Sequence, residues 1–354
     1  MDTIDWGTAQ RIGELIGGSP PYGGLRAETI EPRAHEFASR VSSYSELPLT
    51  AELPPLEMVD RPTWIAANLQ TMRPLLTPLS EKLGEQRGAF GGALGSVSGL
   101  MLGAQVGALT GMLSQRVLGQ YDLALLDAGV PPRLLLISPN LAQAASNLGV
   151  DRDELVLWVT IHEITHAVQF TGAPWLREHI GGMLRELLEG LQVSLADSEG
   201  RSRGFSLPKL PSTGELRDMV ARARSGQLLR LTLGEDRWQL VERMQSAMSL
   251  IEGHAEHTMD AVGAEVLPSL PRMRAAMTRR RTQKGLPWRV LEKLLGLELK
   301  MRQYETGRRF CDAVVAEGGP SLLARVWSGP EALPSAEELE QPALWSARIA
   351  PLAA

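Results

Sequence analysis

The segment VDRDELVLWVTIHEITHAVQF, which follows Gly149, limits the fold of this chain more than any other feature. Asp151 is a favourable residue at a helix N-cap, and acidic residues follow it in the first turn, where the helix dipole favours them. Gly172 and Pro174, in the sequence TGAP, end the pattern. The segment therefore predicts one amphipathic helix, around which the rest of the chain folds.

Two short runs of β-type residues, QYDLALLD and RLLLISPN, precede this helix and are separated by AGVPP. They predict two neighbouring strands. Aromatic residues make up only 5% of the chain, while leucine, alanine, glycine and methionine are abundant, which favours packed helices. We expect a predominantly helical α+β fold with a small sheet. Residues 1–118 form a helical N-terminal region, and residues 119–354 form a second region with C-terminal helices, together one compact unit.

A glycine-rich segment, residues 88–115, contains no charged residue. Glycines recur in it four positions apart, at Gly95, Gly99, Gly103, Gly107 and Gly111. On a helix these glycines form one stripe where a neighbouring backbone can approach closely. The segment also has the roughly 20 residues that cross a bilayer. Polar residues dilute it, however, and Arg87 and Arg116 flank it symmetrically. Composition favours a buried, packed helix, and a membrane-associated helix remains the alternative.

Charge and cysteine content narrow the class of protein further. The net charge is −5, so no global positive field would hold nucleic acid. Cys311 is the one cysteine, which excludes a disulfide framework and a thiolate metal site. The N-terminal sequence MDTIDWGTAQ lacks the apolar stretch of an export signal. We therefore expect a cytoplasmic protein without a nucleic-acid partner.

The pattern HEITH, residues 162–166, lies within the predicted helix. Residues four apart share a helix face, so His162 and His166 can present two imidazoles to one ion. Glu163 lies about 100° round the helix from His162, beside the ion. Zinc in such a site lowers the pKa of water towards about 7, and a neighbouring carboxylate acts as general base. The pattern predicts a zinc-dependent hydrolase, with two ordinary core histidines as the alternative.

A catalytic zinc normally has a third protein ligand, and the segment SLIEGHAEHTMDAVG holds the candidates. The stripe expected to face the core comprises Met244, Met248, Ile251, Ala255, Met259 and Val262. Glu252 lies about 60° from the centre of that stripe, and His254 about 100° away on the other flank. We choose Glu252 as the ligand and Glu256 as the acceptor for a ligand imidazole's other N–H. His254 and His257 remain alternative ligands, and a solvated, charged helix face is the competing interpretation.

The segments IHEITHAVQFTGAPWLREH, LIEGHAEHTMDAVG and KLLGLELKMRQYETGRRFCDAVV carry a resemblance that spans nearly the whole chain. The sequence resembles a mainly actinobacterial family of zincin-like proteins, described as zinc-dependent metalloproteases or as hydrolases associated with biosynthesis of the deazaflavin cofactor. More broadly, HExxH followed far downstream by Glu-Gly on a helix is similar to the gluzincin arrangement. That resemblance implies His162, His166 and Glu252 as ligands and Glu163 as base, although gluzincins lack the extra histidines of LIEGHAEH. Tyr304 is a candidate oxyanion stabiliser, with a structural hydroxyl as the alternative.

The resemblance also implies a zincin-like catalytic core in residues 119–354, with helices added at both ends. The strand LLLISPNL resembles the edge strand that aligns substrate in zincins, where an extended peptide could add by main-chain hydrogen bonds. We therefore predict a zinc metallopeptidase. Two alternatives stay open: a metallohydrolase of a small amide or ester linked to deazaflavin metabolism, and a non-catalytic interaction protein stabilised by zinc.

Overall fold

The structure is a computed structural model that describes residues 4–21, 24–86, 93–127, 129–197, 235–282 and 297–349. In chain order its elements are α1 (Trp6–Gly17), η1 (Ala27–Thr29), α2 (Glu31–Ser45), β1 (Leu56–Val59), α3 (Arg61–Gln86), α4 (Ala93–Ser114), β2 (Gly119–Asp122), β3 (Arg133–Ile137), α5 (Ser138–Leu148), α6 (Arg152–Gly172), α7 (Trp175–Asp197), α10 (Glu235–Val266), α11 (Leu270–Thr282), α13 (Leu297–Ala324), η4 (Arg325–Trp327), η5 (Pro330–Ala332), α14 (Ala336–Glu340) and α15 (Pro342–Ile349). The fold is mostly helical with one small sheet, as the sequence predicts.

The sheet has three strands in the order β1-β3-β2. β2 pairs antiparallel with β3, which confirms the two predicted neighbouring strands. β1 pairs parallel with β3 and was not predicted, because it follows the proline-rich stretch ELPLTAELPP and is only four residues long. The sheet therefore takes one strand from residues 1–118, a region predicted to be helical.

β3 is the central strand, so the expectation that LLLISPNL forms a free edge is wrong. Leu134 and Leu136 belong to a core shared with α2, α5 and α6, whereas Leu135 and Ile137 belong to a core shared with α1 and α3. A strand buried on both faces carries a continuous run of apolar residues. The two edge strands are β1 and β2, and all residues of β2 are partly exposed.

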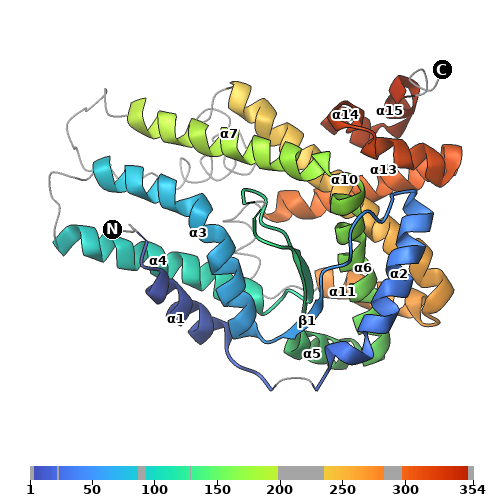
Figure 1. Cartoon of the computed structure of the whole chain (residues 1–354), viewed down its shortest axis with the longest axis horizontal. Helices are drawn as coiled ribbons and strands as arrows, with labels where there is room; N and C mark the ends of the chain where they lie inside the picture. The colour runs from blue at the N-terminus through green and yellow to red at the C-terminus, as the bar shows by residue number, and fades with distance from the viewer. Residues whose placement is uncertain are drawn as a thin grey trace, which may run out of the picture.

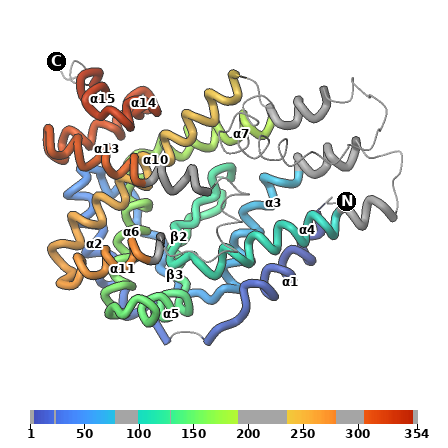
Figure 2. Tube along the Cα trace, turned by 180° about the vertical axis from the view of Figure 1, so that it is seen from behind, coloured from blue at the N-terminus to red at the C-terminus, as the bar shows by residue number. Residues whose placement is uncertain are grey.

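Two groups of helices cover the two faces of the sheet (Figure 1). The helices α1, α3 and α4 lie together on one side, while α2, α6 and α11 lie on the other. The same grouping is seen from behind, where α13, α14 and α15 gather at the end of the molecule that carries the C-terminus (Figure 2). α10 packs against α2, α6, α7 and α13, so it crosses the centre of the second group. The candidate site lies between α6 and α10.

α4 confirms the predicted glycine stripe at Gly103, Gly107 and Gly111. A Cβ atom on Gly107 would overlap the carbonyl oxygen of Ala9 in α1. Gly103 meets the backbone of Asp5, the N-cap residue of α1, and Gly111 meets the backbone of Gly13 in the same way. The absence of side chains on this face lets the two helix backbones come into direct contact. Residues 87–92, which include the start of the predicted segment, lie outside the described part of the chain.

The sequence predicts a buried helix here, but the outer face of α4 is exposed. Leu100 is 45% exposed and Met101 is 65% exposed, because α1 and α3 cover only the other faces of the helix. Among the residues that the structure describes, no helix is both long and apolar enough to cross a membrane.

Candidate metal centre

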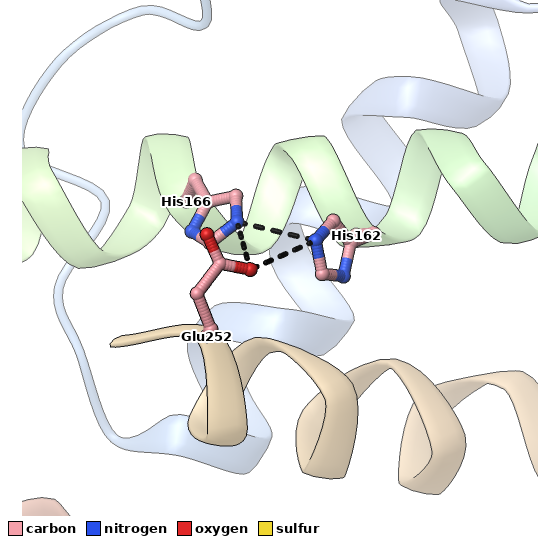
Figure 3. A group of neighbouring side chains, drawn as sticks. All are labelled: His162, His166 and Glu252. Atoms are coloured by element: carbon pink, nitrogen blue, oxygen red, sulfur yellow. Dashed lines mark hydrogen bonds and ion pairs between the residues drawn. The ribbon is translucent and has the colours of Figure 1, made fainter. Parts of the chain in front are cut away.

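α6 begins where the sequence predicts and ends at Gly172, within the TGAP sequence expected to stop it. The side chain of Asp151 caps the helix by accepting a hydrogen bond from the backbone N–H of Glu154 at 2.9 Å. Asp153 and Glu154 supply the acidic first turn. Figure 3 shows His162 and His166 one turn apart on this helix, with both rings directed at Glu252 of α10.

Three side-chain atoms converge between α6 and α10. The Nε2 atoms of His162 and His166 lie 3.2 Å apart. Each Nε2 atom lies 3.7 Å from Oε2 of Glu252. Across the residues whose side chains are described, this is the group of histidine and acidic residues whose ligand atoms converge closely enough for a metal ion.

This group fits a zinc ion. Ligand atoms that surround zinc tetrahedrally at about 2.0–2.2 Å lie about 3.4 Å from one another, close to the observed separations of 3.2 and 3.7 Å. Two imidazole nitrogens and one carboxylate oxygen also form the ligand set of a catalytic zinc, which keeps a fourth position open. His162, His166 and Glu252 could therefore hold such an ion.

The electrostatic field of the group favours a cation. Burial opposes protonation of His162, but Glu252, Glu163 and Glu256 outweigh it and raise the pKa of His162 to about 9. Three carboxylates thus direct negative potential at the point where the two imidazoles meet. A bound metal cation would neutralise this charge.

Glu163 lies beside the group and is held by the sheet. Its side chain is buried, and Oε2 accepts a hydrogen bond from the backbone N–H of Tyr121 in β2 at 2.7 Å. Burial raises the pKa of Glu163, while His162 and His166 oppose that shift. β2 can approach this closely because residue 119 is a glycine, above which the Glu163 side chain packs.

The other candidate residues of α10, His254, Glu256, His257 and Asp260, are buried, so the interpretation of this cluster as a solvated, charged face is wrong. His257 contacts the Tyr44 hydroxyl through Nε2 at 2.7 Å and Asp312 through Nδ1 at 2.6 Å, so both of its ring nitrogens have partners outside the three converging atoms. His254 contacts Gln169 through Nδ1. Glu256 contributes to the raised pKa of His162, and its predicted role as a hydrogen-bond acceptor for a ligand stays a prediction.

The predicted core stripe of α10 holds only in part. Ile251, Ala255, Met259 and Val262 are buried, but Met248 is 38% exposed. Several helices surround the middle of α10. Burial there follows from these neighbours on all sides and not from a single apolar stripe.

Two contributions to the site, from Gln169 and from Tyr121, were not predicted. The Gln169 side chain hydrogen-bonds with His166, with the carbonyl oxygen of Ile251 and with His254, and a buried glutamine three residues after a ligand on the same helix face could have indicated this. The Tyr121 contact uses the main chain, which leaves no signature in the sequence.

Tyr304 falls in α13, but its side chain lies outside the described part of the structure, so its proposed role stays a prediction.

Two comparisons with known proteins give matches over nearly the whole chain. A protein from Chloroflexus aurantiacus, whose crystal structure is provisionally described as that of a hydrolase with a novel fold, is 30% identical in sequence and has a TM-score of 0.69, and the match covers 98% of each chain. No curated protein matches the sequence. The model of the zincin-like metallopeptidase family matches residues 4–346. The chain therefore belongs to the zincin-like metallopeptidase family.

Proposed function

We propose that this protein hydrolyses peptide bonds, with a zinc ion held by His162, His166 and Glu252 and with Glu163 as the general base. One observation supports this proposal above the others: two imidazole nitrogens and a carboxylate oxygen converge beside a second carboxyl group, that of the buried Glu163. When bound, zinc supplies a Lewis acid that acidifies water and polarises a carbonyl group. The protein supplies the proton transfers.

The hydrogen bond from the Tyr121 N–H gives the two carboxylate oxygens of Glu163 different roles. Oε2 accepts the backbone N–H, so it anchors the carboxylate. Oε1 is then the atom that takes up a proton from the attacking water and passes it to the nitrogen of the leaving amine. The raised pKa of the buried Glu163 strengthens it as a base.

The free edge of β2 offers main-chain groups to a peptide. Ile137 N–H donates to the carbonyl oxygen of Leu118 at 2.9 Å, which sets the alternation of the antiparallel ladder. Gly119 and Tyr121 therefore turn their main-chain groups away from β3, and the contact between Tyr121 and Glu163 agrees with this direction. Because Glu163 occupies the N–H of Tyr121, an extended peptide that pairs with this edge by strand addition would use the other main-chain groups of β2 and would lie next to the general base.

Metal content and peptide cleavage test the proposal together. Protein purified without added metal is expected to contain one zinc per chain and to cleave members of an internally quenched peptide library. Removal of the metal by dialysis with 1,10-phenanthroline should abolish cleavage, and added zinc should restore it. Protein without stoichiometric zinc would contradict the metal site. Zinc-loaded protein that hydrolyses only small amides or esters, including deazaflavin-linked metabolites, would contradict the peptide substrate.

A methyl group at residue 119 should disturb the general base without removing the metal. A Cβ atom at Gly119 would lie 2.8 Å from both Cγ and Oε1 of Glu163, too close for the present position of that side chain. Misplacement of a catalytic group by about 1 Å costs up to about 10²-fold in rate. We expect Gly119→Ala to lower kcat about 10- to 100-fold with unchanged zinc content.

The matched control is Gly182→Ala in α7, where an added Cβ meets no atom within 4 Å. This variant is expected to retain the wild-type rate. If Gly119→Ala is as active as Gly182→Ala, β2 does not position Glu163.

A further inference from the structure

Gln169 is a fully buried glutamine on α6, three residues after His166. Its Oε1 atom lies 2.9 Å from Nδ1 of His166. Its Nε2 atom lies 2.9 Å from the carbonyl oxygen of Ile251 and 2.9 Å from Nδ1 of His254. Glutamine is seldom buried without such partners. One amide group therefore connects a histidine of the candidate metal centre to two residues of α10.

The Ile251 carbonyl fixes the direction of these hydrogen bonds. A carbonyl oxygen can only accept, so the NH₂ end of Gln169 must face it. The amide oxygen of Gln169 then faces His166 and can only accept, which places a proton on Nδ1 of that imidazole. A neutral imidazole carries one proton. Nε2 of His166 therefore presents its lone pair at the point where the side chains of Glu252 and His162 converge.

His254 fixes the other end of the chain of hydrogen bonds. The second N–H of Gln169 donates to Nδ1 of His254, so this ring is neutral and carries its proton on Nε2. The edge-to-face contact with Trp327, with ring centroids 5.0 Å apart, restrains its orientation.

We propose that Gln169 is a positioning residue that holds His166 in the tautomer and orientation needed to bind a metal ion, and that His254 holds Gln169 in turn. The proposal rests on the proposed function only in taking His166 as a metal ligand. Without Gln169, the ring of His166 would have to give up the alternative tautomer and rotamers each time it bound an ion. Loss of a group that orients a ligand in this way typically weakens metal affinity about 10- to 100-fold.

Zinc affinity of four proteins tests this proposal. The proteins are the wild type, Gln169→Met, His254→Phe and His257→Phe, each titrated with zinc in competition with a fluorescent chelator. Gln169→Met keeps the length of the side chain but removes its hydrogen bonds, and we expect zinc to bind about 10- to 100-fold more weakly. His254→Phe keeps a ring against Trp327 but removes the acceptor for Gln169, and we expect about a 10-fold loss.

His257→Phe is the matched control, because it removes a buried histidine of the same helix whose contacts are with Tyr44 and Asp312. It is expected to lower the melting temperature but to leave zinc affinity within about twofold of wild type, inside the scatter of such effects. Equal losses in His254→Phe and His257→Phe would show a general packing effect and overturn the proposal. So would Gln169→Met with wild-type affinity.

A measurement on the metal-free wild-type protein separates this proposal from the proposed function. Long-range ¹H–¹⁵N spectra of protein labelled with ¹⁵N-histidine distinguish the two imidazole tautomers. We expect His166 and His254 to carry their protons on Nδ1 and Nε2, respectively. The opposite tautomer at His166 would overturn the role of Gln169, whether or not zinc binds. The expected tautomers in a protein that binds no zinc would instead contradict the metal site alone.

Discussion

Replacement of Glu163 by glutamine is expected to leave zinc bound and to lower peptide hydrolysis about 10²- to 10⁴-fold, the usual contribution of a general acid or base. Glutamine has the same length, and its amide oxygen can still accept the backbone N–H of Tyr121 that anchors this side chain at 2.7 Å. The amide cannot take up a proton from water. The variant therefore removes the proton transfer and keeps the geometry.

Zinc content and initial rates on the same quenched peptides measure both halves of this prediction. Glu178→Gln is the matched control, since this exposed glutamate lies at the start of α7 and the same chemical change there should leave the rate unaltered. Glu163→Gln protein with more than a tenth of the wild-type rate would remove the assignment of Glu163 as base. Loss of zinc from the variant would show that Glu163 supports the metal instead.

The position of this base could be predicted because its signals are local. Asp151 and the acidic first turn lie at the start of α6, and the helix-breaking residues Gly172 and Pro174 lie at its end. The spacing of His162 and His166 needs only the helical repeat to bring both rings to one face. These features depend on neighbours along the chain, and the structure reproduces them.

The approach of Glu252 to the two histidines was predicted from its angular position on α10, and the structure places it there. The burial of the same helix differs from the predicted apolar stripe. Met248 is exposed, while His257 and Asp260 are buried, because the contacts of α10 with α2, α7 and α13 decide this. Such contacts join segments far apart in the sequence and leave no periodic pattern on one helix.

The sequence contains a signal for the positions of β3 and β2 in the sheet, but not for β1. The run LLLI in β3 has no polar alternation, which is typical of a strand buried on both faces, whereas GQYD in β2 is polar and lies at the edge. β1 gave no such signal, because four residues after several prolines are too short for a pattern. The main-chain contact between Tyr121 and Glu163 follows from this sheet, so sequence alone could not place it.

Replacement of Glu252 by alanine is expected to weaken zinc binding by more than about 100-fold, beyond the loss caused by removing a residue that only orients a ligand. Oε2 of Glu252 lies 3.7 Å from both imidazole nitrogens and supplies the negatively charged oxygen of the set. Without it, two neutral imidazoles would hold the cation with fewer ligands than a catalytic zinc normally has. Peptide hydrolysis should fall in parallel, since it requires the ion.

The comparison with His254→Ala decides which residue of α10 is the third ligand, and chelator competition is the measurement. If Glu252 binds the ion and His254 acts only through Gln169, the loss in zinc affinity must be larger for Glu252→Ala. Glu265→Ala, on an exposed acid of the same helix, controls for the change in net charge and should bind zinc as the wild type does. A larger loss in His254→Ala would assign the ligand to the histidine, and the hydrogen bond with Gln169 would then have to break when metal binds.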